Sequence, residues 1–352
     1  MFLVTGGAGF IGSSLVRALV EDKSAPVVNV DKLTYAANPA SLADLATDPR
    51  YAFEQIDICD GAAVRRVFET YRPSVVLHLA AESHVDRSID APADFVQTNL
   101  VGTFTLLAEA RRYWMGLSPE RAARFRFVHV STDEVFGSLG PNGSFTEQSR
   151  YDPTSPYSAT KAGSDHLARA WHRTYGLPVI VTYSSNNFGP RQFPEKLIPL
   201  TILTALAGER IPVYGSGENV RDWIHVDDHV AALLRVAAEG QAGETYAIAS
   251  ENRRRNIDVV TAICDLVDGL APNGDREPRR HLVRFVEDRP GHDYRYALDA
   301  SKIRAELGWQ PRHTFESALE DTVRWYIENR SWWEPLLGGS HPATRIGLGR
   351  SA

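Results

Sequence analysis

The first nineteen residues constrain the fold more than any other part of the chain. Residues 2–4 predict a short apolar strand, and apolar residues from Phe10 to Leu19 then recur at helical spacing. The loop between them, Gly6-Gly7-Ala8-Gly9-Phe10-Ile11-Gly12, has glycine at every third position. Glycines between a strand and a helix permit a tight turn and let backbone N–H groups approach a pyrophosphate at the helix N-terminus. This segment therefore predicts a dinucleotide-binding α/β fold.

The alternation of strand and helix continues through the first half of the chain. The sequence predicts further strands at 27–30, 51–55, 75–79, 127–130 and 179–181, and helices that include 64–71, 93–112 and 158–175. This rhythm favours a doubly wound parallel sheet of the Rossmann-like kind. After residue 186 proline and glycine become frequent and the elements shorten. We therefore expect a cofactor domain at 1–186 that carries the catalytic groups. Residues 187–352 should form mainly a smaller C-terminal α/β substrate lobe, with some segments returning to the first domain.

Composition excludes several classes of partner. The net charge of −6 favours neither nucleic acid nor an anionic membrane. No apolar run reaches membrane length, and the strand at residues 2–4 leaves no room for a signal peptide. The two cysteines, Cys59 and Cys264, imply neither a disulfide framework nor a cysteine-based zinc site. We expect a cytoplasmic protein that binds no membrane, no nucleic acid and no metal.

An acidic residue suggests which dinucleotide the glycine loop accepts. Asp31 follows Gly12 by nineteen residues and ends the second predicted strand. A carboxylate at that position accepts hydrogen bonds from an adenosine ribose and repels a 2′-phosphate. The sequence therefore favours NAD over NADP. Residues 57–58 and 80–81 also follow predicted strands, at the sheet edge where such folds bind ligands.

Two pairs of side chains indicate which reactions the chain could catalyse. Tyr157 and Lys161 are four residues apart, so they share one face of a helix. The lysine is expected to lower the tyrosine pKa, so that a tyrosinate removes an alcohol proton as hydride leaves. Asp133 and Glu134 directly follow the fifth predicted strand. Two carboxyl groups can divide acid and base roles, which indicates a second reaction that moves protons between carbon and a leaving oxygen.

Longer motifs carry a resemblance to a known family. They are TGGAGFIGS at 5–13, DKLTYA at 31–36, HLAAESHVDRSI at 78–89, VQTNLVGT at 96–103, STDEVFGSLG at 131–140, SPYSATKAGSDH at 155–166, SNNFGP at 185–190, FPEKLIPL at 193–200, VRDWIHVDDH at 220–229 and DRPGHD at 288–293. On these motifs the chain resembles the extended short-chain dehydrogenases/reductases. Within them it resembles the enzymes that remove water from a nucleotide sugar. The Thr-Asp-Glu triplet and FPEKLIP are the most specific marks.

The resemblance implies a reaction on dTDP-glucose. Tyr157 would deprotonate the C4 hydroxyl while hydride passes from C4 to NAD. Glu134 would then remove the C5 proton, and Asp133 would protonate the departing C6 hydroxyl. Hydride would return to C6, leaving a 4-keto-6-deoxy sugar nucleotide and NAD as it began. Thr132 would hydrogen-bond near the C4 oxygen, and Lys161 completes the catalytic set.

The resemblance also implies the remaining binding residues and the assembly. The expected NAD contacts are Gly6, Gly9, Phe10, Ile11, Gly12, Asp31, Lys32, Leu33, Thr34, Asp57, Ile58, Leu79, Ala80, Ala81, Thr98, Tyr157, Lys161 and Asn187. The expected substrate contacts are Ser83, Thr132, Asn186, Lys196, Leu197, Pro212, Val213, Tyr214, Arg221, Asn256, Arg289 and His292. The two arginines suit a diphosphate, and Tyr214 suits stacking on a pyrimidine. A homodimer is expected, joined through the 93–112 helix and the helix that carries Tyr157.

The sequence is also compatible with other functions. A UDP-sugar 4-epimerase, a UDP-glucuronate decarboxylase or a UDP-sugar 4,6-dehydratase would share the glycine loop and the Tyr157/Lys161 pair. An epimerase needs no acid at C6, so Asp133 argues against it. A protein of another class, which binds NAD without turnover and acts by interaction, would need none of the catalytic groups.

Overall fold

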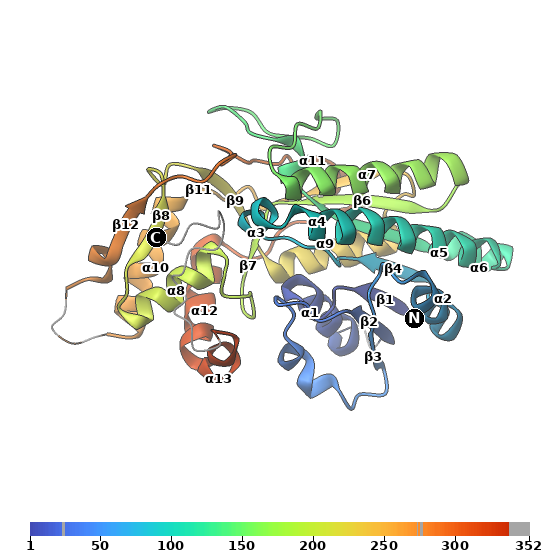
Figure 1. The fold of residues 1–352 in the computed structure, drawn as a ribbon, viewed down its shortest axis with the longest axis horizontal. Helices are drawn as coiled ribbons and strands as arrows, with labels where there is room; N and C mark the ends of the chain where they lie inside the picture. Colours follow the sequence, from blue (N-terminus) through green and yellow to red (C-terminus); the bar gives the residue numbers. More distant parts are fainter. Residues whose placement is uncertain (23–24, 273, 275–276, 338–352) are drawn as a thin grey trace.

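A seven-stranded parallel sheet forms the centre of the molecule. The computed structural model describes residues 1–22, 25–272, 274 and 277–337. The strand order is β10-β6-β5-β4-β1-β2-β3, and every neighbouring pair is parallel. The strands are β1 (Phe2–Thr5), β2 (Val27–Asp31), β3 (Tyr51–Gln55), β4 (Val75–His78), β5 (Arg126–Thr132), β6 (Val179–Ser184) and β10 (Thr245–Ile248). The predicted doubly wound fold is confirmed (Figure 1).

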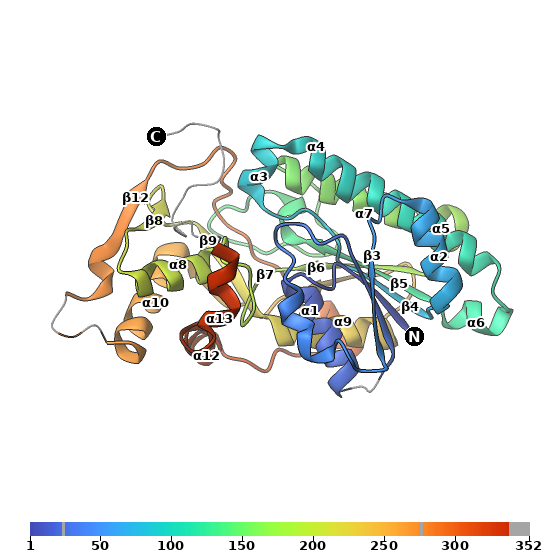
Figure 2. The same ribbon diagram turned by 60° about the horizontal axis from the view of Figure 1, so that its bottom comes forward.

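Helices cover both faces of this sheet. Figure 2 shows α2, α5 and α7 on one face and α1 and α9 on the other. These helices are α1 (Phe10–Arg17), α2 (Gly61–Tyr71), α5 (Thr103–Met115), α7 (Pro156–Tyr175) and α9 (Val226–Glu239). Shorter helices connect them: α3 (Val85–Asp90), α4 (Pro92–Phe95), α6 (Pro119–Arg124) and α11 (Ser301–Leu307). Because apolar side chains are removed from water on both faces, the central strands β2 and β6 are buried along their whole length.

The helix predicted over 93–112 is not a single α-helix. It consists of α4, a π-helical segment at Val96–Gly102, and α5. Gly102 packs against Ile58, where an added Cβ would lie 2.6 Å from the isoleucine Cδ1. The wider turn buries Thr98 and Asn99 on the side of the glycine loop. π-Helical insertions of this kind are frequent at functional sites.

The second lobe has its own core. Its strands form a three-stranded sheet, β11-β9-β7, and a two-stranded sheet, β12-β8. Their bounds are β7 (Asn186–Phe188), β8 (Ile211–Tyr214), β9 (Val220–His225), β11 (Arg253–Arg255) and β12 (Val283–Val286). The lobe's helices are α8 (Leu197–Ala207), α10 (Asn256–Leu270), α12 (Phe315–Glu328) and α13 (Arg330–Trp333). Their apolar faces meet in a cluster that is separate from the core around the large sheet.

The chain crosses between the two cores more than once. α9 and β10 lie beyond residue 186, yet β10 pairs with β6 and α9 packs in the larger core. The division into 1–186 and 187–352 therefore stays a prediction about the main parts only, and residues 338–352 lie outside the described residues. Among the described residues, no helix is both long and apolar enough to span a bilayer.

Candidate active site

The glycine loop is shaped by close backbone contacts. Gly6 has a φ of 74°, in the left-handed region that favours glycine. A Cβ added to Gly12 would lie 2.1 Å from the carbonyl oxygen of Gly6, so a side chain at residue 12 would push the loop apart. α1 begins at Phe10, directly after these turns. Gly6, Gly9 and Gly12 line the large cavity described below, so the loop presents the N-terminus of α1 to a bound group such as a pyrophosphate.

Asp31 ends β2 beside this loop. Its Oδ2 accepts a hydrogen bond from the Ala8 N–H at 3.0 Å, and its Oδ1 accepts one from the Leu33 N–H at 2.8 Å. Burial raises the pKa of this carboxyl, while the two backbone donors lower it. The adjacent Lys32 lies 3.5 Å from Asp57 and donates to the Thr98 hydroxyl at 3.1 Å. Residues from three separate segments are thus fixed around the end of β2.

A large cavity, open to solvent, runs along the carboxyl edge of the sheet and holds about 1550 Å³ of space. All the predicted catalytic residues line it. The predicted cofactor residues that line it are Gly6, Gly9, Phe10, Ile11, Gly12, Asp31, Lys32, Thr34, Ile58, Leu79, Ala80, Ala81, Thr98, Tyr157, Lys161 and Asn187. Leu33 and Asp57 lie beside the cavity rather than on its wall. Leu33 contributes its N–H to Asp31, and Asp57 faces Lys32.

The Thr-Asp-Glu triplet is placed by the end of β5. The strand ends at Thr132, and the next four residues form a tight 3₁₀ turn. The Thr132 hydroxyl caps this turn by accepting from the Glu134 N–H at 3.3 Å. Asp133 is only 2% exposed, and its Oδ2 has no hydrogen-bond partner among the described residues. A buried carboxyl with an unpartnered oxygen is expensive as an anion, so it favours the protonated form.

The two carboxyl groups of the triplet differ in their surroundings. Burial, followed by the charges of Glu134 and Asp222, raises the pKa of Asp133 well above its usual value. Burial also raises the pKa of Glu134, but the charges of Arg289, Arg221 and Lys196 lower it. Asp133 is therefore suited to donate a proton and Glu134 to accept one.

The local sequence explains where α7 begins. The Ser155 hydroxyl accepts from the Ser158 N–H at 3.1 Å, the Ser158 hydroxyl accepts from the Ser155 N–H at 3.0 Å, and Pro156 occupies the first helical position. This capping box sets Tyr157 in the first turn, facing the triplet. Lys161 follows one turn later and donates to the Val130 carbonyl oxygen at 2.8 Å.

The lowering of the tyrosine pKa that we expect from Lys161, together with the positive charge of an oxidised nicotinamide, has to overcome the surroundings of Tyr157. Burial raises the pKa of Tyr157 above its usual value, and the nearby charge of Glu134 raises it further. A hydrogen bond with Thr132 opposes these effects. Burial lowers the pKa of Lys161 to about 8, and the charge of Asp165 opposes that shift. Burial therefore favours the phenol over the tyrosinate at Tyr157, so a positive charge close by is needed before this residue can accept a proton.

Two predicted substrate residues meet on one carboxylate that the sequence analysis did not single out, and a third packs against one of them. Asp86 accepts from Arg289 at 3.0 Å and from the Tyr214 hydroxyl at 3.1 Å. The Tyr214 ring meets His292 edge to face at 6.2 Å between centroids. A guanidinium, a phenol and an imidazole are thus held together on the second-lobe side of the triplet.

The predicted substrate residues differ in whether they line the large cavity. Ser83, Asn186 and Lys196 line the large cavity, whereas Leu197, Pro212, Val213, Tyr214, Arg221, Asn256, Arg289 and His292 do not. Val213 is 2% exposed and belongs to the core of the second lobe, so only its backbone is available to a ligand. Arg221 is 5% exposed and donates to the Asp293 carbonyl oxygen at 2.9 Å. Its charge still acts on Asp133 and Glu134.

A clasp beside the cavity was not predicted. The Tyr35 hydroxyl donates to Glu195 Oε1 at 3.1 Å, and the Arg87 guanidinium lies over the Tyr35 ring at 3.7 Å. Glu195 also lies 3.7 Å from His84. Glu195 lines the cavity, and this clasp links the loop after β2 to the segment before α8 beside it. The motifs DKLTYA and FPEKLIPL contain these residues, but nothing in either motif shows that the two segments meet.

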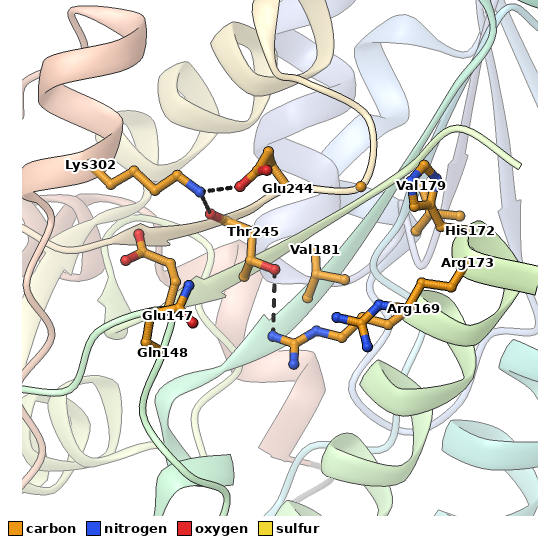
Figure 3. A pocket seen from close by; sticks show the side chains of 11 residues that line it. Glu147, Gln148, Arg169, His172, Arg173, Val179, Val181, Glu244, Thr245 and Lys302 are labelled. Atoms are coloured by element: carbon orange, nitrogen blue, oxygen red, sulfur yellow. Dashed lines mark hydrogen bonds and ion pairs between the residues drawn. The ribbon is translucent and has the colours of Figure 1, made fainter. Parts of the chain in front are cut away.

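A second polar pocket lies at the opposite end of the same strands. Figure 3 shows Glu147, Arg169, Glu244 and Lys302 around the first residues of β6 and β10. Lys302 contacts Glu244 at 2.6 Å and donates to the Thr245 carbonyl oxygen at 2.9 Å. Lys302 and Glu244 pair with each other, Glu147 accepts from the Ala247 N–H and Arg169 donates to the Thr245 hydroxyl, so these charged groups have partners within the protein. The pocket lies away from the glycine loop and the triplet. We therefore assign the functional site to the large cavity.

A parallel sheet with a glycine loop after β1 and a tyrosine–lysine pair on α7 defines an extended short-chain dehydrogenase/reductase. The family model described as GDP-mannose 4,6 dehydratase matches residues 3–322. The chain belongs to this family of sugar-nucleotide dehydratases.

Relatives within the family are close. The chain is 58% identical to a dTDP-glucose 4,6-dehydratase of Neisseria meningitidis serogroup B, over 99% of both proteins. It is 54% identical to a dTDP-glucose 4,6-dehydratase of Escherichia coli, over 98% of this chain and 99% of the relative. The solved structure of a dTDP-glucose 4,6-dehydratase from Streptomyces venezuelae with NAD bound is 47% identical. That comparison covers 95% of this chain and 99% of the other, with a TM-score of 0.87.

Proposed function

We propose that this chain is an NAD-dependent dTDP-glucose 4,6-dehydratase, which converts dTDP-glucose to dTDP-4-keto-6-deoxyglucose and water. The observation that carries the proposal is the burial of Asp133, which raises the pKa of its carboxyl and so favours the protonated form. Asp133 lines the same cavity as Glu134 and Tyr157. Relatives of this name at 54–58% identity support the same activity.

The residues present fit NAD. Gly6, Gly9 and Gly12 line the cavity at the N-terminus of α1, which suits a pyrophosphate, and Asp31 offers carboxylate oxygens for a ribose. A negative charge at Asp31 disfavours the extra phosphate of NADP. When bound, NAD supplies the hydride acceptor for C4 and the hydride donor for C6. The clasp between Tyr35 and Glu195 holds two segments together beside the cavity, which would help to retain a cofactor through turnover.

The chain's own groups divide the proton transfers. Tyr157 takes the proton of the C4 hydroxyl as a tyrosinate, a form that the positive charges of Lys161 and of an oxidised nicotinamide would favour, with Thr132 lining the same cavity. The C4 ketone makes the C5 proton acidic, and Glu134 removes it. Asp133 gives its proton to the C6 oxygen, which leaves as water. Arg289, Tyr214 and His292 are positioned to hold the nucleotide diphosphate through the guanidinium and the ring of the tyrosine.

Asp133 separates this proposal from the related activities. A 4-epimerase only oxidises and re-reduces C4, so a buried, protonated carboxyl at C6 would serve no step. A protein that binds NAD without turnover would have no use for two carboxyl groups with different pKa values at the edge of β5.

We also infer a homodimer joined through α5 and α7. Phe95 and Leu107 are buried within one subunit, but Val101 and Phe104 are 39% and 48% exposed on the same helical stretch. The Phe104 ring meets Trp171 of α7 edge to face, and Tyr175 on α7 is 42% exposed. These adjacent helices thus present an apolar surface suited to a second copy. Sedimentation should give a dimer for the parent and a monomer for Phe104→Glu, whereas Phe285→Glu, an exposed phenylalanine on β12, should remain dimeric.

We place the protein in the cytoplasm. Cys59 and Cys264 are both free, and thiols persist in a reducing compartment. Cell fractionation with a tagged chain would test the location.

Mass spectrometry of dTDP-glucose after incubation with the purified protein, without added NAD, tests the activity. Loss of one water, together with a ketone that can be trapped at C4, would support both the dehydration and the tightly held cofactor. An unchanged mass, repeated with added NAD, would rule out the proposed activity.

A further inference from the structure

Two histidines and an aspartate from separate segments meet at the beginning of α9. His225 ends β9, Asp227 lies in the first turn of α9, and His313 precedes α12. One potential ligand atom from each residue lies within 4.8 Å of the other two. The two imidazole rings lie 4.4 Å apart between centroids, and His225 Nδ1 is 3.7 Å from Asp227 Oδ2. None of the three takes part in the proposed catalysis.

We propose that His225, Asp227 and His313 form a binding site for a divalent transition metal ion such as Zn²⁺. Two imidazoles and one carboxylate are a ligand set that such ions favour, because neutral nitrogen and anionic oxygen donors suit their borderline softness. Three protein ligands leave a further coordination position for water. The chemistry of the set therefore points to a cation of the zinc, nickel or copper type rather than to calcium or magnesium, which prefer oxygen ligands.

The surroundings hold the cluster in place before any ion binds. The buried Asp228 carboxylate accepts hydrogen bonds from the Arg312 N–H at 2.9 Å and the His313 N–H at 3.1 Å. These bonds fix the backbone of His313 against α9. Asp228 Oδ1 also lies 3.1 Å from the His313 ring nitrogen Nδ1. A small rotation of the ring would let Nδ1 donate to Asp228, which is the arrangement in which a carboxylate orients a metal-binding imidazole.

One buried ring atom lacks a partner. The Nδ1 atom of His313 is buried and makes no hydrogen bond within the described part of the chain, since its contact with Asp228 lacks hydrogen-bond geometry. The Asp227 side chain is 64% exposed and that of His313 is 36% exposed, whereas His225 is only 7% exposed. The two exposed ligands are therefore free to rotate by the small amount that coordination distances near 2 Å require.

The site would join the two cores of the molecule. Val226 and Val230 of α9 pack in the core around the large sheet, while Phe315 and Leu319 of α12 pack in the core of the second lobe. An ion that binds His225 and Asp227 on one side and His313 on the other would link these cores directly. Because it would bind the folded chain and not the unfolded one, it would raise the temperature of unfolding.

Isothermal titration calorimetry with ZnCl₂ on the full chain, first treated with a chelator and dialysed, tests the proposal. We expect one ion per subunit, with affinity roughly tenfold weaker or worse in His313→Gln and in Asp227→Asn. Zn²⁺ should also raise the unfolding temperature of the parent by several degrees and that of His313→Gln much less. Both substitutions change exposed side chains outside the core, so the variants should fold.

The matched control is His281→Gln. His281 is also a partly exposed histidine beside a carboxylate, 3.9 Å from Glu277, but lies outside the cluster. Its substitution should leave Zn²⁺ binding unchanged. The proposal is wrong if the parent binds no Zn²⁺ up to millimolar concentration, or if His313→Gln and Asp227→Asn bind it as tightly as the parent does.

Discussion

The charged groups near the two ends of β6 differ in whether they have hydrogen-bond or ion-pair partners. At its carboxyl end, Ser184 lines the cavity that contains Asp133 and Glu134. At its amino end, Val179 and Val181 line the second polar pocket. There Glu244 is paired with Lys302, and Glu147 accepts from the Ala247 N–H at 2.9 Å. Asp133, by contrast, has a buried oxygen without a hydrogen-bond partner in the part of the chain that the structure describes.

This difference shows that a gathering of charged side chains does not by itself mark a functional site. Paired charges at the amino end lower the cost of their own burial and hold β10 and α11 in place. The unpaired side chain of Asp133, at the carboxyl end of the strands, destabilises the folded chain. It also keeps a proton at the sheet edge where ligands bind. The predictions below test whether activity depends on one end of β6 and not on the other.

Tyr157→Phe should have the largest effect. Removal of the phenol hydroxyl takes away the group that accepts the C4 proton, so turnover should fall on the order of 10³-fold. No NADH absorbance should appear when dTDP-glucose is added. Tyr175→Phe, which changes an exposed tyrosine on the same helix, should retain normal turnover. Normal turnover in Tyr157→Phe would remove this residue from the mechanism.

Asp133→Asn should come next, with turnover reduced roughly 10²-fold. An amide cannot protonate the C6 oxygen, but oxidation at C4 does not require it. NADH absorbance should therefore accumulate on the enzyme during incubation with dTDP-glucose. Glu147→Gln, at the other end of β6, should leave the rate within about twofold of the parent, in line with a solvated charge. If Asp133→Asn eliminates water at the parent rate, the acid has been assigned wrongly.

Arg289→Ala should weaken substrate binding rather than chemistry. A charge-assisted hydrogen bond to a phosphate contributes about 1.5–3 kcal/mol, so KM should rise roughly 10- to 100-fold while kcat changes less. Asp86 would then lose its cationic partner. Steady-state kinetics with dTDP-glucose measure this split. Arg280→Ala removes an exposed arginine paired with Asp265 and should not change KM. An unchanged KM in Arg289→Ala would show that the diphosphate lies elsewhere.

Asp165→Asn should have the smallest effect, and one that depends on pH. Asp165 accepts from Ser131 at 2.8 Å and from Tyr151 at 3.0 Å, and its charge raises the pKa of Lys161. Without that charge the pKa of Lys161 should fall below its value of about 8. Lys161 is charged only below its pKa, so the alkaline fall in kcat/KM should begin at lower pH.

A pH profile of kcat/KM measures this shift. At pH 6 the variant and the parent should agree, and at pH 8 the variant should be roughly three- to tenfold slower. A uniform loss at all pH values would instead indicate a structural role for Asp165.

Much of the fold could be predicted because periodicity reports burial. Six of the seven strands of the large sheet are short apolar runs that lie within a few residues of their predicted places, and β10 was not predicted. The helix predicted over 93–112 shows where this reasoning stops. A π-helical turn depends on what Gly102 packs against, and its neighbour Ile58 is far away in the sequence. Likewise, β10 joins the sheet by pairing with β6, which no local pattern reveals.

The residues of the candidate site also fall into those that the sequence predicts and those that it does not. Gly12, Asp31 and Tyr157 were found because their motifs are continuous in sequence. Asp86 and the Tyr35–Glu195 clasp were not, because their contacts join residues more than a hundred positions apart. The raised pKa of Tyr157 could not be predicted either, since burial and the charge of Glu134 appear only in three dimensions.

The fate of a deuterium label at C4 of dTDP-glucose tests the central claim most directly. The account predicts that the label leaves C4 and is recovered at C6 of a product that has lost one water, with a solvent proton at C5. Nuclear magnetic resonance of the product locates the label. A label that remains at C4, in a product of unchanged mass or inverted configuration, would contradict the assignment of Asp133 and Glu134 and with it the dehydratase function.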